Sequence, residues 1–124
     1  MITHEHIKAT FASLVAIDSP SLSEREMADH IKTLFAGIGI ALLEDESGTV
    51  TGSTAGNLYA YVDGDPTLAP ILLAAHMDTV APACGKQAVF HEDGRVTSDG
   101  TTVLGADDLA GVTAIYEALR KIRE

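Results

Sequence analysis

The feature that most constrains the fold is an uninterrupted apolar segment at residues 71–75, with the sequence ILLAA, which runs directly into His76. Apolar and polar residues do not alternate here, so a strand formed by this segment would present apolar side chains on both faces. Such a strand is buried only in a sheet that helices cover on both sides. The sequence therefore predicts an α/β fold, a mostly parallel sheet flanked by helices, with 71–75 near its centre.

Helical periodicity is found on both sides of this segment. The N-terminal residues repeat an apolar stripe with the spacing i, i+4, i+7 and i+8, and Ser19-Pro20-Ser21 ends it because proline disfavours helical geometry in the residue before it. A last helix is predicted from about Asp108 to the end of the chain. The apolar stripe residues are Ile7, Phe11, Leu14 and Val15 in the first helix, and Val112, Ile115, Tyr116, Leu119 and Ile122 in the last.

A further helix is predicted to begin near Ser23, with Met27, Ile31, Leu34 and Phe35 as its apolar stripe. Ser23 and Glu26 have the spacing of a capping box, in which a hydroxyl and a carboxylate satisfy the first free amides of a helix. Gly37 and Gly39 are candidates for its left-handed stop.

Short strands are predicted around the central segment. Residues 40–46 and the apolar residues 58–62 are each predicted to form a short strand, and a polar, glycine-bearing loop separates them. Residues 89–92 and 95–97 flank Asp93-Gly94, the dipeptide typical of a tight hairpin turn. No repeat or linker divides residues 1–124, which we treat as one unit.

Composition excludes several classes of partner. The chain of 124 residues has a formal net charge of −10, which repels phosphate backbones and anionic lipid, so neither nucleic acid nor a membrane is expected as a partner. The N-terminus lacks the basic and apolar regions of a signal peptide, and Cys84 is the only cysteine. Both features favour a cytoplasmic location.

The first chemical motif follows the predicted central strand. In α/β sheets, ligands gather beyond the carboxyl ends of the strands, where His76 and Asp78 lie. Two residues that are two positions apart share one side of an extended chain, and a carboxylate can orient an imidazole that binds zinc. By itself the pattern also fits a buried structural histidine followed by an aspartate turn.

The second motif is Asp107-Asp108, at the start of the predicted last helix. Aspartate is a good helix cap, so two acids at this place need no metal to explain them. Combined with a histidine at a strand end, however, a carboxylate of this pair supplies half of a two-metal site.

These motifs carry a family resemblance. Residues 75–82 (AHMDTVAP) and 98–111 (SDGTTVLGADDLAG) closely resemble the peptidase T-like tripeptidases of the co-catalytic zinc aminoacylase and carboxypeptidase family. The similarity also covers the N-terminal helices and the segment around 51–58. It implies a zinc-exopeptidase-like catalytic domain, of which residues 1–124 would be the incomplete N-terminal part.

The resemblance implies a role for each matching residue. His76 would bind one zinc ion, Asp78 would be the catalytic acid that orients this histidine, and Asp107 would bridge two zinc ions. The Asp107–Asp108 peptide bond would be cis. Cobalt or manganese could replace zinc. The implied substrate is a short peptide, most simply a tripeptide with a free amino terminus, and a homodimer would form through a domain outside this chain.

This chain departs from the family pattern in two ways. Leu109 stands where the family usually has lysine. The chain also lacks a glutamate pair, of which one acts as general base and the other as ligand, and it lacks a later acidic ligand and a distant histidine. Because two metal ions need more ligands than His76 and Asp107 provide, we expect the 124-residue chain to be inactive by itself.

Other readings stay open at this point. The same scaffold would also serve an amidohydrolase of N-acyl amino acids or a carboxypeptidase, although residues 98–108 favour the tripeptidase branch. A non-catalytic α/β module that binds magnesium through an aspartate is a different class, against which His76 argues because magnesium prefers oxygen ligands. A purely structural or assembly role is the third alternative.

Overall fold

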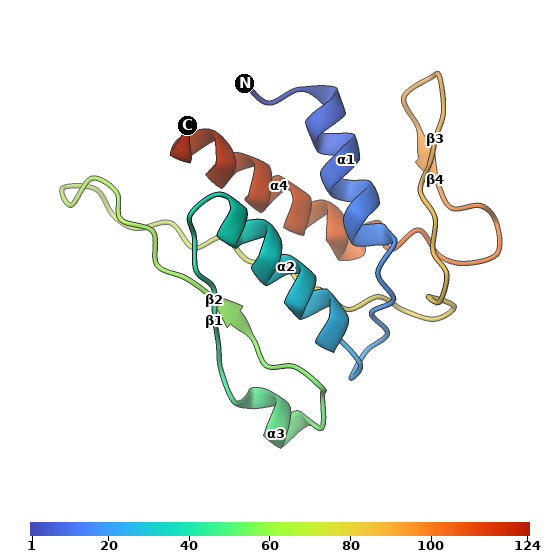
Figure 1. Ribbon diagram of the computed structural model, residues 1–124, viewed down its shortest axis with the longest axis horizontal. Coiled ribbons are helices and arrows are strands. Elements are labelled where there is room, and N and C mark those ends of the chain that lie inside the picture. The colour runs from blue at the N-terminus through green and yellow to red at the C-terminus, as the bar shows by residue number, and fades with distance from the viewer.

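The computed structural model describes residues 1–124, and its core lies within a layer of three helices (Figure 1). These are α1 (His4–Val15), α2 (Arg25–Gly37) and α4 (Ala106–Arg123). Most of the predicted apolar stripe residues meet between them, and the ring of Tyr116 packs edge-on against Phe35 at 5.4 Å between centroids. The predicted stripe residues Ile7 and Ile122, near the outer ends of α1 and α4, are instead exposed. The buried core residues are Phe11, Leu14, Val15, Met27, Ile31, Phe35, Ile40, Leu109 and Val112.

Polar contacts join α1 to α4. The buried carboxylate of Glu117 accepts a hydrogen bond from Thr10 Oγ1 at 2.7 Å and pairs with Arg120 at 2.8 Å. The amino terminus lies 2.9 Å from the Glu124 carboxylate, so the two ends of the chain are neighbours (Figure 1).

None of the helices combines the length and the apolar character that a membrane crossing requires.

The two ends of α2 differ in how well the sequence predicts them. Gly39 adopts the predicted left-handed conformation with φ 76°. The predicted capping box is wrong, because the helix begins two residues after Ser23, at Arg25. The residue at the N-cap is Glu24, and its side chain makes no capping hydrogen bond. Instead, the amide of Arg25 donates to Thr54 Oγ1 at 3.0 Å, and a contact from a distant loop replaces the local one.

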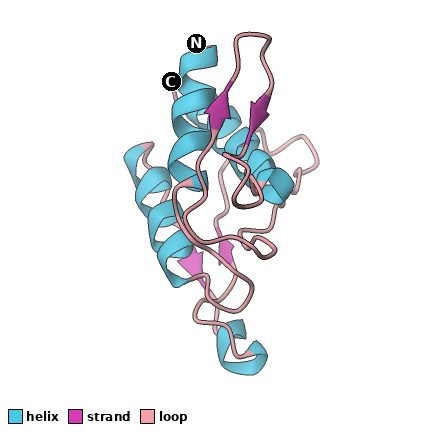
Figure 2. Ribbon diagram, turned by 90° about the vertical axis from the view of Figure 1, so that its right-hand side faces the viewer, coloured by secondary structure: helices cyan, strands magenta, loops and turns pink.

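The strands are short and form two antiparallel pairs (Figure 2). β1 (Leu43–Glu44) pairs with β2 (Leu58–Tyr59), and α3 (Ser47–Thr51) lies in the loop that connects them. β3 (Val89–Phe90) pairs with β4 (Val96–Thr97), and Gly94 between them has φ 88°. The predicted hairpin is therefore confirmed, whereas the predicted strands at 40–46 and 58–62 shrink to two residues each.

The structure differs most from the prediction at residues 71–75. They form no strand, and Ile71 and Leu72 are 85% and 89% exposed. The only parallel pairing in the chain is an isolated bridge between Pro20 and Thr79, so the mostly parallel sheet is not formed by these residues. The physical reason is that a central strand needs a hydrogen-bonded neighbour on each edge, and no other part of this chain lies there.

Candidate functional site

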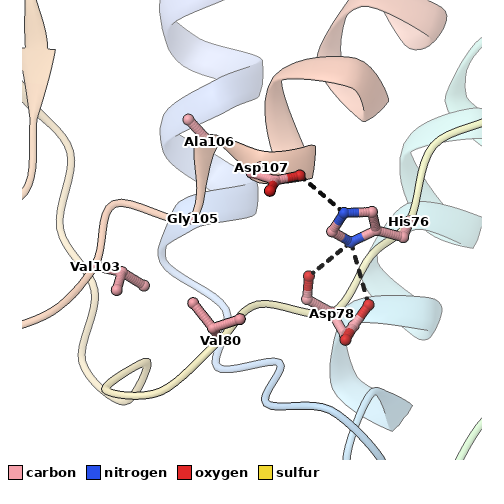
Figure 3. A pocket seen from close by; sticks show the side chains of 7 residues that line it. All are labelled: His76, Asp78, Val80, Val103, Gly105, Ala106 and Asp107. Carbon is pink, nitrogen blue, oxygen red and sulfur yellow. Dashed lines mark hydrogen bonds and ion pairs between the residues drawn. The ribbon is translucent and has the colours of Figure 1, made fainter.

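His76, Asp78 and Asp107 come together at one cavity, although Asp107 lies 29 positions after Asp78 in the sequence (Figure 3). The loop that follows 71–75 supplies the first two, and the start of α4 supplies the third. The cavity has a volume of about 260 Å³. Its lining residues are His76, Asp78, Val80, Val103, Gly105, Ala106 and Asp107.

The imidazole of His76 lies between two carboxylates (Figure 3). Its Nε2 is 2.9 Å from Asp107 Oδ1, and its Nδ1 is 3.2 Å from Asp78 Oδ1 and 3.0 Å from the Asp78 carbonyl oxygen. Desolvation alone would lower the pKa of His76, but the hydrogen bond to Asp107, the Asp78 carbonyl and the two negative charges together raise it. The Asp107 side chain is 96% exposed and therefore open to a ligand.

The two adjacent acids have different surroundings. Asp108 Oδ1 accepts a hydrogen bond from the Gly111 amide at 3.2 Å, so this residue caps the regular part of α4. A Cβ on Gly111 would lie 2.5 Å from that oxygen, which explains the glycine. Asp107 has no such task and faces His76. The peptide bond between the two acids is cis, as the family resemblance predicts.

Gly105 sets the direction in which the chain enters α4. Its φ is 80°, a conformation that glycine adopts without strain. A Cβ at this position would lie 2.9 Å from Thr79 Cγ2, so the turn also packs directly on the loop that carries His76 and Asp78. The close approach brings the two halves of the site together.

Lys86 connects the segment after the site loop to the residues that follow α1, and sequence reasoning missed it. The side chain is buried, and its ammonium donates to the carbonyl oxygens of Ile17 at 2.8 Å and Ala83 at 3.1 Å. Burial lowers its pKa. The amide of Thr79 also donates to the Ser19 carbonyl at 2.8 Å, so the site loop is fastened to the segment that follows α1.

Sequence reasoning also missed Ser21. Its hydroxyl donates a hydrogen bond to Asp78 Oδ2 at 2.5 Å. In the sequence, Ser19-Pro20-Ser21 indicates only a helix break, and no local pattern connects Ser21 with a residue 57 positions later. The contact depends on the bridge between Pro20 and Thr79, which the structure alone reveals.

The remaining histidines and the cysteine lie outside the site. His4, His6, His91 and Cys84 are exposed. His30 in α2 is half-buried, because it faces α1. Its Nε2 lies 3.1 Å from Ser13 Oγ, within hydrogen-bond distance. Leu109, the departure from the family pattern, is fully buried in the helical core and does not face the cavity.

The donor atoms fit a shared zinc ion in type and in spacing. Imidazole nitrogen and carboxylate oxygen are both zinc ligands at about 2.0–2.2 Å, which places two such ligands roughly 3.3 Å apart around a tetrahedral ion. His76 Nε2 and Asp107 Oδ1 are 2.9 Å apart, so a shift of a few tenths of an ångström suffices. No group of three or more histidine, cysteine, aspartate or glutamate side chains is arranged so that it could hold a metal ion.

Two solved structures share this fold closely. A tripeptidase from Staphylococcus aureus superposes with a TM-score of 0.91 at 37% identity, over 98% of this chain and 33% of its own. The aminopeptidase PepT from Bacillus cereus gives a TM-score of 0.79 at 36% identity, over 96% of this chain and 32% of its own. Over nearly its whole length, the chain is similar to these peptidase T-like proteins. Its α/β fold is therefore that of the corresponding part of these two enzymes.

Curated relatives show the same similarity. The chain is 31% identical to peptidase T of Caldanaerobacter subterraneus over 77% of its own length and 29% of that protein. It is 39% identical to the uncharacterized protein YqjE of Bacillus subtilis, over its whole length and 33% of that protein. No protein-family model matches the chain. The chain spans about a third of the length of the relatives it matches.

Proposed function

We propose that this chain supplies His76, Asp78 and Asp107 to the site of a two-zinc exopeptidase that hydrolyses short peptides. The observation that carries the proposal is the 2.9 Å approach of His76 Nε2 to Asp107 Oδ1, two zinc-compatible atoms from segments far apart in the sequence. The similarity of the chain to a solved tripeptidase and a solved aminopeptidase supports the same proposal.

Each residue has a separate task in this proposal. His76 presents Nε2 to a metal ion while its Nδ1–H donates to Asp78, which fixes the ring orientation and the tautomer. Asp107 would hold metal through its exposed carboxylate. When bound, zinc would supply a water molecule of lowered pKa as the nucleophile. The general base and the remaining ligands would come from residues outside this chain.

The substrate is proposed to be a tripeptide with a free amino terminus. The proposal predicts that the chain by itself does not hydrolyse peptides, because Asp78 and Asp107 are both engaged with His76 and no further carboxylate lines the cavity. Zinc-dependent tripeptide hydrolysis by the purified chain would contradict this part of the proposal.

A chimaera tests the function directly. This chain replaces the corresponding third of the Staphylococcus aureus tripeptidase, which is possible because the two superpose with a TM-score of 0.91. We expect the chimaera to hydrolyse tripeptides, to lose activity with a zinc chelator, and to recover it with added zinc. His76→Ala and Asp107→Asn should each abolish activity, whereas His91→Ala, an exposed histidine outside the site, should not.

The same chimaera separates the alternatives. Preference for N-acyl amino acids over tripeptides would favour the amidohydrolase reading. Magnesium binding by the isolated chain that survives His76→Ala would favour a non-catalytic module. A correctly folded chimaera that is inactive with zinc would overturn the proposal.

A further inference from the structure

We propose that Ser21 is a positioning residue that holds the Asp78 carboxylate in the orientation in which it supports His76. The inference rests on the proposed function of the His76 site and adds a residue to it. Ser21 touches neither His76 nor Asp107, so it acts only through Asp78.

The two oxygens of Asp78 have separate partners. Oδ2 accepts the hydrogen bond from Ser21 Oγ at 2.5 Å, and Oδ1 faces His76 Nδ1 at 3.2 Å. With Oδ2 held, the Asp78 side chain can neither leave its χ1 rotamer nor rotate its carboxylate without breaking a charge-assisted hydrogen bond. Ser21, Asp78, His76 and Asp107 therefore form one linear chain of contacts that ends at the exposed Asp107 carboxylate.

The backbone places Ser21 beside Asp78. Pro20 pairs with Thr79 in the isolated parallel bridge, and the Thr79 amide donates to the Ser19 carbonyl at 2.8 Å. The segment before α2 thus lies beside the site loop at this one pair of residues, Pro20 and Thr79. Ser21 is the next residue along, which brings its hydroxyl within reach of the Asp78 carboxylate.

The turn after Ser21 is held in a conformation that it would not adopt unaided. Leu22 has φ 72°, which is unfavourable for a residue with a branched side chain and is kept only where neighbouring contacts impose it. The imposing contact is Glu24, a buried carboxylate that accepts from the Leu22 amide at 2.6 Å and from Ser53 Oγ. This arrangement has no core-packing purpose, because Leu22 is exposed.

The test compares Ser21→Ala, Ser21→Thr and the matched control Ser47→Ala in the 124-residue chain. Ser47 Oγ also donates to an exposed aspartate, Asp45 Oδ1 at 2.6 Å, but far from the site. The first readout is the Asp78 side-chain rotamer in the metal-free chain, from NMR three-bond couplings. The second is the zinc dissociation constant by calorimetry, with His76→Ala as the reference for loss of the site.

We expect a single Asp78 rotamer in wild type, in Ser21→Thr and in Ser47→Ala, and averaged couplings in Ser21→Ala. Zinc affinity should fall about tenfold in Ser21→Ala, because loss of a residue that orients a metal ligand usually has an effect of this size. The affinity should recover in Ser21→Thr, which keeps the hydroxyl. An unchanged rotamer in Ser21→Ala overturns the inference whatever zinc does. Zinc binding that is insensitive to His76→Ala overturns the proposed function instead, and the rotamer still decides the role of Ser21.

Discussion

The helical layer and the segment 71–75 contain the same kinds of side chain but have opposite environments. Leu14 in α1 is 0% exposed, whereas Leu72 is 89% exposed. Both belong to strongly apolar stretches of the sequence. The difference shows that apolar character alone does not bury a residue, because burial also requires a complementary surface.

The backbone explains why one region is complete and the other is not. A helix satisfies its amides and carbonyls internally, so α1, α2 and α4 need only each other's apolar stripes. An extended segment needs neighbours for its backbone groups, and residues 69–76 make no backbone hydrogen bond in this chain. The helical layer is therefore the region that stabilises the chain, and the following changes test this.

The largest effect is expected for Leu14→Ala. The change removes a fully buried side chain from the contact of α1 with the rest of the core, and leaves a cavity there. The free energy of unfolding should fall by about 2–5 kcal/mol. Denaturant unfolding followed by circular dichroism measures it, and a loss below about 1 kcal/mol would mean that the helical layer is not the stabilising core.

A smaller effect is expected for Glu44→Gln, which loosens the attachment of β1 to α2. The Glu44 carboxylate accepts hydrogen bonds from Arg25, Lys32 and the Gly56 amide, and these hold its pKa well below the ordinary value of 4.5. The free energy of unfolding should fall by about 1–2 kcal/mol at neutral pH.

The pH dependence of this effect has a definite sign. Because the pKa of Glu44 is lowered in the folded state, its contribution is complete above pH 4.5 and is lost as the pH falls below that value. The difference between wild type and Glu44→Gln should therefore shrink on acidification. Glu5→Gln, at an exposed carboxylate 3.7 Å from Lys8, is the control and should show no measurable change at either pH.

The smallest effect on unfolding is expected for Leu72→Ala, the same chemical change as Leu14→Ala at an exposed position. The free energy of unfolding should change by less than about 0.5 kcal/mol, because the side chain has few contacts to lose. The same denaturant measurement applies. A loss comparable to that of Leu14→Ala would mean that 71–75 is packed in solution and that the contrast between the two regions is wrong.

The exposed segment has a second measurable property. An apolar extended segment with unpaired backbone groups is a site of association between chains. Sedimentation velocity should show concentration-dependent association of the wild-type chain, and Leu72→Lys should reduce it. Association that Leu72→Lys leaves unchanged would place the contact elsewhere on the surface.

Features with a local cause could be predicted from the sequence. The three long helices, the Asp93-Gly94 hairpin and the left-handed Gly39 follow from periodicity and turn chemistry. The proximity of His76 and Asp107 was expected from two motifs together, and the structure places them 2.9 Å apart. Their metal-binding role stays a prediction.

Features with a distant cause could not be predicted. The first turn of α2 is capped by Thr54 rather than Ser23, and a serine in a helix break bonds to Asp78. Each of these two contacts joins segments that are distant in the sequence. No residue pattern within either segment predicts that the two segments lie side by side. The strand expected at 71–75 is absent for a related reason. The apolar side chains of this segment are evident from the sequence, but the sequence does not show whether another segment lies beside it.

The buried ammonium of Lys86 gives the chain a built-in reporter. Lys8, Lys32 and Lys121 are at least partly accessible to an amine-modifying reagent in the folded state, whereas Lys86 is 2% exposed and can react only when its segment separates from the residues that follow α1. The rate at which Lys86 is labelled, relative to the other three, therefore measures how often this contact opens while the helices stay folded.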